Sequence, residues 1–418
     1  MILASRNFES IFAYLGCLRN GLIPLVLSSD LDRKQISKFV KQFDPRLIFA
    51  PSEVNLPSFR PIKEWGNAVL HEASDPKPRV FPDDLALLQP TSGSTGEPKC
   101  VRVSYKNIVA SSAAISDYLR MDSGRVLISS LPLHYTYGLS LLHISLFAGA
   151  DFVVTGKSIT DRDFWRSFQA HHVSDFSGVP FHFDSLHKIG FPASVFKSLK
   201  CVTQAGGFLA PEKTRWWLDY LQPRGISYFT MYGQTEATPR ISFVPPNMAL
   251  AKLGSVGIAI PGGRIEIINP DDRGIGEITY YGPNVALGYA YDAEGSGRAD
   301  DFLGTLHTGD LGYLDEDRFL FLTGRKNRFL KVSGVKVNLD GVEKAVSERG
   351  IVAAAIGAED RLVVVCQGEA EETVGSLICS NFGLPGSMVR VHFLESLPRL
   401  ESGKISYKLL EKDFLVDV

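Results

Sequence analysis

The hydrophobic and polar positions of residues 1–50 alternate between two periods. Apolar side chains recur every three or four positions between Asn7 and Gly21, which predicts an amphipathic helix with a polar cap and a glycine stop. The apolar run LIPLVL over residues 22–27 predicts a buried strand, and a second helix over 32–43 and a second strand at RLIFAP follow it. Alternation of this kind is typical of an α/β fold.

The alternation resumes over residues 125–233. Helical patterns there separate the apolar segments VLISSL, DFVVTG, DFSGVP, KCVTQAG and SYFTMYG. Such a series predicts parallel strands joined by crossover helices. Over residues 254–322 the apolar segments become short and rich in glycine and proline, which predicts an antiparallel or barrel-like β region.

A run of positive charge, GRKNRFLK at residues 324–331, separates these segments from a C-terminal part with the pattern of a small α+β unit. A chain of 418 residues is too long for one compact core, so we place a domain boundary near residues 325–328. The predicted fold class is an α/β large domain over residues 1–325, with parallel sheets, crossover helices and a small β-barrel-like region. A small mobile α+β domain over residues 326–418 is expected to follow.

Charge and composition narrow the class of protein. The 44 lysines and arginines are balanced by 46 aspartates and glutamates, so no nucleic-acid surface is expected and any anion must be held by local groups. The five cysteines are scattered and never in CxxC spacing, which argues against a disulfide framework or structural zinc and favours a reducing cytoplasm. The start of the chain lacks a signal-peptide pattern, and the most apolar stretch, residues 137–154, contains His143 and Asp151, so we expect a cytoplasmic protein without membrane insertion.

The segment TSGSTGEPK at residues 91–99 follows the apolar run LALLQP. Its four hydroxyls, two glycines and one lysine can offer side-chain donors, exposed backbone N–H groups and a cation to a polyphosphate. The spacing is not that of a Walker A loop, because the lysine is not followed by serine or threonine. Taken alone, the segment is also typical of a surface turn rich in serine and glycine.

Three further segments carry candidate chemistry. YGQTE at residues 232–236 follows a predicted strand, where its glutamate can hold Mg²⁺ and its tyrosine can stack on a purine. The aspartate of HTGD at residues 307–310 can accept both hydroxyls of a ribose. PRLESGK at residues 398–404 presents a lysine after a glycine turn, suited to act as a mobile cation. Each of the three, taken alone, fits an ordinary strand end, turn or exposed tail as well.

The five segments TSGSTGEPK, YGQTE, HTGD, GRKNRFLKVSGVKV and PRLESGK occur in this order, and together they resemble the adenylate-forming superfamily of acyl-CoA synthetases, peptide-synthetase adenylation domains and luciferases. NFESIFAYLGCLRNGLIPLVL also resembles the first helix and strand of that superfamily, so the resemblance covers essentially the whole chain. It implies an AMP-forming acid–thiol ligase. A carboxylate would attack the α-phosphorus of ATP, with Mg²⁺ and lysine neutralising charge, and the acyl group would then pass to a thiol.

The resemblance also implies roles for residues of this sequence. The β- and γ-phosphates would be bound by the hydroxyl-rich loop, namely Thr91, Ser92, Gly93, Ser94, Thr95, Gly96 and Lys99. Nucleoside and α-phosphate contacts would come from strand ends and turns: Gly206, Gly207, Tyr232 and Gly233 at the adenine, Asp310 and Arg325 at the ribose, and Thr235 at the α-phosphate. Glu236 would hold the metal. Lys404 would bridge the carboxylate and the α-phosphate, with Thr235 and Glu236 as further catalytic residues.

For the second step, the resemblance implies that the small domain rotates about Asn327. Lys404 would withdraw, and Lys331 and Gly334 would move to the thiol tunnel. The sequence departs from the family at Asn327, usually aspartate or lysine, and at Tyr407, often arginine. The phosphate loop also comes early in the chain, so an N-terminal layer of the large domain is expected to be missing. These departures leave open a nucleotide-binding homologue without turnover, although Lys404 and Glu236 are retained.

The stretch LPLHYTYGL bears on the substrate. Adenylation domains for α-amino acids commonly place an aspartate here, whereas this chain has His134 and Tyr135, so a substrate ammonium would be left unpaired in an apolar pocket. We therefore predict a small carboxylic acid without an α-amino group. The pocket candidates, each of which also fits a core position, are His134, Tyr135, Tyr137, Phe181, Ala205 and Phe208.

Two acceptors remain open for the second step. LPLHYTYGLS, AGG, MYGQTEAT and GVKVNLD resemble compact standalone members of the superfamily, which favours the phosphopantetheine of an acyl carrier protein as partner. The alternative is an acyl-CoA or aryl-CoA synthetase that uses free CoA. The HHVSD segment is one residue short of a condensation-domain motif, and no GxSxG elbow of a triad hydrolase is present.

Overall fold

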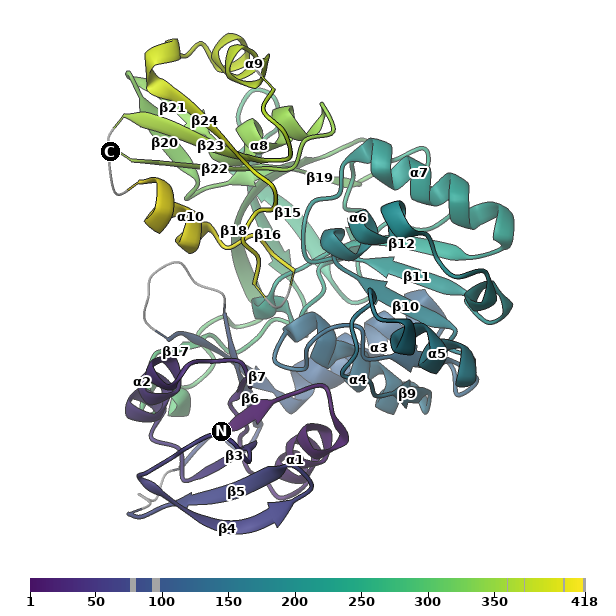
Figure 1. The fold of residues 1–418 in the computed structure, drawn as a ribbon, viewed down its shortest axis with the longest axis vertical. Coiled ribbons are helices and arrows are strands. Elements are labelled where there is room, and N and C mark those ends of the chain that lie inside the picture. The colour runs from purple at the N-terminus through teal and green to yellow at the C-terminus, as the bar shows by residue number, and fades with distance from the viewer. Residues whose placement is uncertain (76–79, 92–97, 359, 372, 401–402, 416–418) are drawn as a thin grey trace.

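A computed structural model describes residues 1–75, 80–91, 98–358, 360–371, 373–400 and 403–415. Its N-terminal part, purple in Figure 1, is a five-stranded sheet in the order β2-β1-β3-β5-β4. The elements are β1 (Ile2–Ala4), α1 (Phe8–Arg19), β2 (Val26–Ser28), α2 (Arg33–Phe43), β3 (Leu47–Pro51), β4 (Phe59–Trp65) and β5 (Ala68–Ala73). β1 pairs in parallel with β2 and β3, which confirms the predicted alternation of strands and helices.

The helix predicted after Asn7 is confirmed, because the Asn7 side chain caps the N-terminus of α1. The strand predicted over residues 22–27 begins later, at Val26. The Leu22 N–H donates to the carbonyl of Cys17, so the turn that ends α1 continues into the apolar run. Pro24 then has no N–H for a sheet ladder.

The predicted phosphate loop lies between two strands of a three-stranded antiparallel sheet. The strands are β6 (Leu85–Pro90), β7 (Cys100–Ser104) and β17 (Tyr289–Ala290), in the order β17-β7-β6. Pro90 is opposite Cys100, and the Thr91 N–H donates to the Lys99 carbonyl at 3.1 Å. The two ends of residues 91–99 are therefore held together.

The central sheet has seven strands in the order β14-β13-β12-β11-β10-β8-β9, shown in teal and blue in Figure 1. Its strands are β8 (Val126–Ile128), β9 (Asp151–Val153), β10 (Asp175–Gly178), β11 (Cys201–Gln204), β12 (Ser227–Tyr232), β13 (Ser242–Phe243) and β14 (Ile258–Ala259). The associated helices are α3 (Tyr105–Leu119), α4 (Thr136–Ala148), α5 (Arg162–Ala170), α6 (Pro180–Ile189) and α7 (Pro211–Leu221). The run from β9 to β12 is parallel, as predicted.

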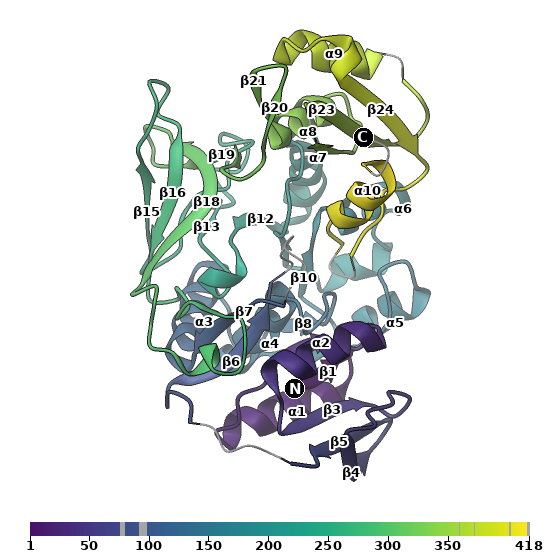
Figure 2. The ribbon, with the colours of Figure 1, turned by 90° about the vertical axis from the view of Figure 1, so that its left-hand side faces the viewer.

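The predicted antiparallel region is a four-stranded sheet in the order β15-β16-β18-β19. Its strands are β15 (Arg264–Ile268), β16 (Gly276–Tyr281), β18 (Thr305–Leu314) and β19 (Leu320–Arg325). Figure 2 shows this sheet beside the central sheet and below the C-terminal part. Short 3-10 helices join elements at η1 (Ala193–Lys197), η2 (Gln222–Arg224), η3 (Thr235–Ala237), η4 (Gly295–Gly297) and η5 (Gly386–Met388).

The C-terminal part, green to yellow in Figure 1, packs over one end of the molecule. It contains β20 (Phe329–Val332), β21 (Val335–Asn338), α8 (Leu339–Ser347), β22 (Ala353–Ala358), β23 (Arg361–Gln367), α9 (Thr373–Phe382), β24 (Val389–Leu394) and α10 (Tyr407–Phe414). Its buried apolar side chains form two clusters drawn from this part alone, one around Val364 and one around Leu410. The sequence pattern did not predict β24 or α10.

The apolar stretch at residues 137–154 forms most of α4 and then β9, as expected of a buried helix and strand. None of the helices in the described part of the chain combines the length and the apolar character needed to cross a bilayer.

Candidate active site

The carboxyl ends of β10, β11 and β12 meet at one edge of the central sheet, because the three strands are parallel neighbours. Gly206 follows β11 with φ +82°, and a Cβ atom at this position would lie 2.4 Å from the Tyr135 hydroxyl. Any larger residue would therefore displace Tyr135. Gly207 packs beside Pro180, and Gly233 lies against the backbone of Pro239. These predicted adenine-binding positions border one edge of the sheet, where open α/β sheets bind ligands.

Asp310 is held on both of its oxygens. The Tyr232 hydroxyl donates to Oδ2 at 2.5 Å, and Arg325 Nε donates to Oδ1 at 3.2 Å. Asp310 and Arg325 are directly opposite in the β18–β19 ladder, so the pair is fixed by strand register. Burial raises the pKa of the Asp310 carboxyl, and Arg325 and the Tyr232 hydrogen bond oppose that rise. The remaining lone pairs of this oriented carboxylate can accept vicinal hydroxyls.

Glu236 is buried in η3 and accepts a hydrogen bond from the Tyr289 hydroxyl at 2.8 Å. Lys99 Nζ lies 3.5 Å from the centroid of the same tyrosine ring. Thr235 Oγ1 and Thr136 Oγ1 are 3.0 Å apart. Tyr289 therefore contacts both the lysine at the end of the phosphate loop and the predicted metal-binding carboxylate.

The residues present fit a magnesium ion that retains phosphate and water ligands. No group of three or more histidine, cysteine, aspartate or glutamate side chains that could hold a metal occurs in the described ranges. Glu236 is the predicted metal residue, and its second oxygen does not take part in the Tyr289 hydrogen bond. Mg²⁺ is commonly bound by one or two carboxylates together with substrate phosphates, rather than by an all-protein cage.

Five predicted phosphate-binding residues lie outside the described residues: Ser92, Gly93, Ser94, Thr95 and Gly96. Thr91 and Lys99, at the two ends of the loop, are described. The Thr91 hydroxyl is buried and has no hydrogen-bond partner within the described ranges. A buried hydroxyl of this kind is available to an incoming acceptor.

Lys404 lies in a tight turn between β24 and α10. The Leu400 N–H donates to the Lys404 carbonyl at 2.8 Å, and the Gly403 N–H donates to the Leu400 carbonyl at 2.8 Å. Gly403 has φ +79°, and a Cβ atom there would lie 2.8 Å from Val179 Cγ2. The turn therefore packs closely against the chain that follows β10.

The Lys404 ammonium shares its environment with the other predicted residues. Its Nζ lies 5.3 Å from the centroid of the Tyr135 ring. Burial lowers the pKa of Lys404, Arg325 lowers it further, and Glu236 and Asp310 oppose the decrease. The charges of Arg325 in β19, Glu236 in η3 and Asp310 in β18 thus all act on one lysine, although these residues are far apart in the sequence.

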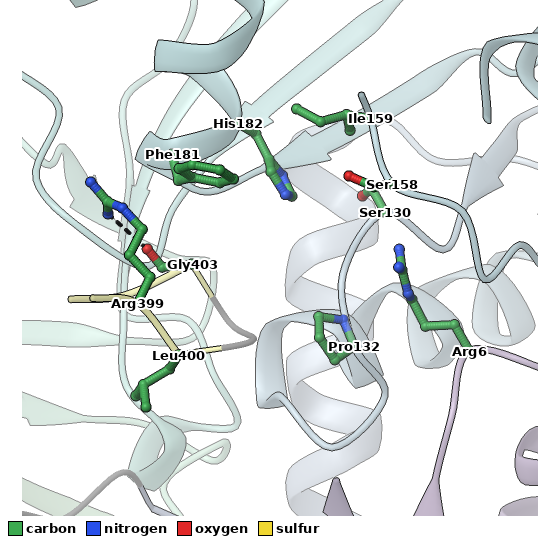
Figure 3. A pocket seen from close by; sticks show the side chains of 10 residues that line it. All are labelled: Arg6, Ser130, Pro132, Ser158, Ile159, Phe181, His182, Arg399, Leu400 and Gly403. Carbon is green, nitrogen blue, oxygen red and sulfur yellow. Dashed lines mark hydrogen bonds between the residues drawn. The ribbon is translucent and has the colours of Figure 1, made fainter. Parts of the chain in front are cut away.

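A cavity of about 170 Å³ lies beside this turn (Figure 3). Arg399, Leu400 and Gly403 of the C-terminal part line one side, and Arg6 of the β1–α1 loop lies across from them. Arg6 donates to the carbonyls of residues 156 and 157 at 3.0 Å, and Arg399 donates to the Gly403 carbonyl at 2.9 Å. The remaining lining residues are Ser130, Pro132, Ser158, Ile159, Phe181 and His182. Two guanidinium groups give this cavity a positive lining.

The predicted acyl-pocket residues fall into two groups. Tyr135 and Tyr137 pack edge to face, with ring centroids 6.3 Å apart. Ala205 is buried and lies between the end of β11 and Gly206. The carbonyl of His134 accepts a hydrogen bond from Gln89. Phe181 and Phe208 are exposed, and Phe181 lines the cavity beside Arg399.

The residues predicted for the second step are not brought to Lys404. Lys331 and Gly334 are exposed on the β20–β21 hairpin, and no hydrogen bond or ion pair within the described ranges joins Lys331 to the site. Asn327 is exposed in the turn between β19 and β20. Their predicted roles stay predictions.

Sequence reasoning missed two residues. Tyr289 contacts both Lys99 and Glu236, but a tyrosine within a glycine-rich segment gave no distinctive signal. Arg240 is buried beside Tyr137, with its guanidinium carbon 4.1 Å from the ring centroid. The sequence places this charged residue directly before the apolar segment ISFV, and that position could have indicated a buried arginine.

The chain is similar to proteins whose sequences and structures are known. A sequence profile for the family described as AMP-binding enzyme matches residues 1–290. The chain is 28% identical to the 4-coumarate–CoA ligase-like 6 protein of Arabidopsis thaliana over 81% of this chain and 64% of that protein, less than two thirds of its length. It is 30% identical to the 2-succinylbenzoate–CoA ligase of Bacillus cereus strain AH820, over 97% of this chain and 86% of that one.

A solved structure shares the fold. The O-succinylbenzoate coenzyme A synthetase of Bacillus subtilis, in complex with ATP and a magnesium ion, superposes with a TM-score of 0.75. The superposition covers 97% of this chain and 87% of that chain, at 24% identity. The predicted α/β architecture with a C-terminal α+β part is therefore confirmed.

Proposed function

The chain belongs to the AMP-binding enzyme family, and on that premise we propose that it uses ATP to convert a carboxylic acid into an acyl-adenylate and then transfers the acyl group to a thiol. The observation that carries the proposal is the position of Lys404. Its Nζ lies beside the Tyr135 ring, and its pKa responds to Arg325, Glu236 and Asp310. A cation at this point can meet both a carboxylate and an α-phosphate.

In the first step, a carboxylate oxygen forms a bond to the α-phosphorus while the bond to pyrophosphate breaks. Lys404 would hold the two negative groups together, which lowers the barrier through orientation and charge stabilisation. Asp310, oriented by Tyr232 and Arg325, would bind the ribose hydroxyls. Thr235 would contact the α-phosphate.

ATP and Mg²⁺ are the proposed co-substrate and cofactor. Glu236 would hold the metal, and Tyr289 keeps one carboxylate oxygen of Glu236 in place. Thr91 and Lys99 would face the outer phosphates from the two ends of the loop. When bound, Mg²⁺ would supply neutralisation of phosphate charge.

We further propose that residues 1–325 and 326–418 act as two domains that turn relative to each other at Asn327. The separate apolar clusters of the C-terminal part support this division. Turning would withdraw Lys404 and carry Lys331 and Gly334 toward the acyl-adenylate. Such closure also keeps water from a labile anhydride.

Free CoA is the proposed thiol acceptor. The relatives described above carry the names of CoA ligases. The preference for an acyl carrier protein that the sequence suggested therefore lacks support, and the CoA alternative is favoured. The predicted acid has no α-amino group, since no carboxylate stands at His134 or Tyr135.

The test is ATP–pyrophosphate exchange that depends on added carboxylic acid, with wild type, Lys404→Ala and Lys408→Ala. Lys408 is an exposed lysine of α10, four positions from Lys404, and serves as the matched control. We expect exchange in wild type and Lys408→Ala, and a loss of about 100-fold or more in Lys404→Ala. Thioester formation with CoA and with a phosphopantetheinyl carrier protein, measured side by side, decides the acceptor.

Two outcomes would overturn the proposal. Wild type that binds ATP but supports no exchange with any acid would indicate a nucleotide-binding homologue without turnover. Unchanged exchange in Lys404→Ala would remove the role of that lysine.

A further inference from the structure

Arg240 is a buried cation that pairs with no acidic side chain among the described residues. Three arginines are buried in the described part of the chain, and two of them pair with carboxylates: Arg102 with Asp301 at 2.6 Å, and Arg125 with Asp175 at 2.8 Å. Arg240 is 3% exposed, and no carboxylate of the described residues lies within 4.0 Å of its guanidinium. Removing a guanidinium from water without a counter-charge costs on the order of several kcal/mol.

The groups around Arg240 are phenols. Its guanidinium carbon lies 4.1 Å from the centroid of the Tyr137 ring, and its charge also acts on the Tyr118 phenol, whose pKa it lowers. Its Nε is buried and has no hydrogen-bond partner within the described ranges. Several of its N–H groups are therefore available to a further acceptor.

These phenols do not neutralise the charge of Arg240. Burial raises the pKa of Tyr118, Tyr135 and Tyr137, and Arg240 opposes the rise for all three. The tyrosines thus stay uncharged at neutral pH, while the positive charge acts on each of them. A cation–π contact recovers only a part of the cost of desolvation.

The phenols connect Arg240 to the reacting end of the site. The Tyr137 ring packs against the Tyr135 ring, and the Tyr135 ring lies 5.3 Å from Lys404 Nζ. The Tyr137 hydroxyl is held by Thr203 of β11, at 2.7 Å from Oγ1, which keeps the ring in place. Two cations, Lys404 and Arg240, therefore stand at the two ends of one aromatic wall.

We infer that the acid activated here carries a second carboxylate, remote from the reacting one, and that Arg240 is the counter-ion of that group. The substrate class is then a dicarboxylic acid. This inference rests on the proposed function, since Lys404 must bind the reacting carboxyl. A guanidinium can bind a carboxylate through two parallel hydrogen bonds, and the dry surroundings strengthen such a pair.

The same geometry provides selection against monocarboxylic acids. An acid of equal length with a methyl group in place of the second carboxylate would cover Arg240 without pairing it. Sites that lose a buried polar partner in this way reject the analogue strongly. Arg240 is thus assigned as a specificity-determining residue.

The experiment compares matched acids in ATP–pyrophosphate exchange with the full chain. Aliphatic and aryl dicarboxylic acids are each paired with the monocarboxylic acid that has a methyl group at the second position. For at least one pair, wild type is expected to prefer the diacid by about 100-fold or more in kcat/KM. Arg240→Met should raise KM for the diacid and abolish or reverse the preference.

Two further variants distinguish the loss of the proposed ion pair from a general defect of the fold. Arg240→Lys keeps the charge but loses the two-pronged geometry, so it should retain a part of the preference. Arg224→Met removes an exposed arginine of η2 and should leave the preference unchanged. Thermal melting of each variant checks that it folds. If Arg240→Met does not fold, the diacid preference of wild type, read together with Arg240→Lys, decides the question.

The outcomes for the two proposals are distinguishable. Wild type that exchanges monoacids as well as their paired diacids would overturn the inference and leave the proposed function standing. Absence of exchange with every acid would overturn the proposed function. In that case, a diacid that raises the Tm of wild type but not of Arg240→Met still supports Arg240 as a carboxylate-binding residue, and equal shifts reject that role.

Discussion

Arg325 and Arg328, three positions apart, form ion pairs with different parts of the chain. Arg325 Nε lies 3.2 Å from Asp310 in the β18–β19 ladder, whereas Arg328 lies 2.9 Å from Glu343 and 2.5 Å from Asp340 of α8. The exposed turn that contains Asn327 separates the two arginines. Each side of the turn is therefore fixed to its own part of the molecule, which is what a hinge at Asn327 requires.

Asn327→Pro is expected to uncouple the two half-reactions. Proline fixes its own φ and restricts the residue before it, so the turn loses the freedom that rotation needs. Asn327 does not have positive φ, so the fixed negative φ of proline does not oppose a left-handed backbone at this position. Pyrophosphate exchange should stay within about threefold of wild type, while thioester formation should fall by about 100-fold, as expected for misplaced reacting groups.

Asn327→Ala is the control for this variant, because alanine keeps the backbone freedom of the turn. Both half-reactions should proceed in it. A hinge at this position would be rejected if Asn327→Pro formed thioester at the wild-type rate.

Tyr289→Phe is expected to raise the Mg²⁺ requirement. The hydroxyl of Tyr289 donates to Glu236 at 2.8 Å, and its loss leaves a buried carboxylate less well oriented. The Mg²⁺ concentration that gives half-maximal exchange should rise by about tenfold. Tyr291→Phe, an exposed neighbour, is the control. Identical Mg²⁺ titrations of Tyr289→Phe and wild type would contradict the role of this hydroxyl.

The sequence predicted those features that depend on local order. Alternating strand and helix patterns gave the parallel core, and the motifs gave Asp310, Arg325 and Lys404, which the fold brings together. The contacts of Tyr289 and Arg240 depend on neighbours more than 100 positions away in sequence, such as Lys99 and Tyr137. Burial and partner identity of this kind arise from packing, so a single sequence does not reveal them.

The decline of pyrophosphate-exchange activity at high pH should reflect the deprotonation of Lys404. Burial lowers the pKa of its ammonium below the ordinary value of 10.5, so the charged form is lost at a lower pH than for a free lysine. Because the proposed role needs the positive charge, kcat/KM for exchange should decline as pH rises through this lowered pKa.

Lys404→Arg tests the origin of that decline. Arginine stays protonated, so whatever activity remains should keep its value at a pH where wild type has declined. Lys408→Arg is the matched control and should retain the wild-type profile. A decline at the same pH in wild type and Lys404→Arg would assign the titration to another group.

Gly403→Ala should impair the first step and spare the second. Gly403 has φ +79°, which costs an L-residue roughly 1 kcal/mol or more, and the new Cβ atom would lie 2.8 Å from Val179 Cγ2. The turn must then move away from Val179, and Lys404 moves with it. Exchange should fall by roughly 10- to 100-fold, whereas thioester formation from supplied acyl-adenylate, which does not need Lys404, should be retained.

Gly386→Ala gives the matched control for Gly403→Ala. Gly386 lies in η5 of the same C-terminal part, and a Cβ atom there would meet no atom within 4 Å. Both variants should melt within a few degrees of wild type, since each adds one methyl group at a turn. Loss of both half-reactions together in Gly403→Ala would mean that the turn supports the fold of the site as a whole. Gly403→Ala and Asn327→Pro should therefore affect opposite half-reactions. Gly403→Ala weakens the position in which Lys404 faces the nucleotide, whereas Asn327→Pro retains that position and prevents the rotation away from it.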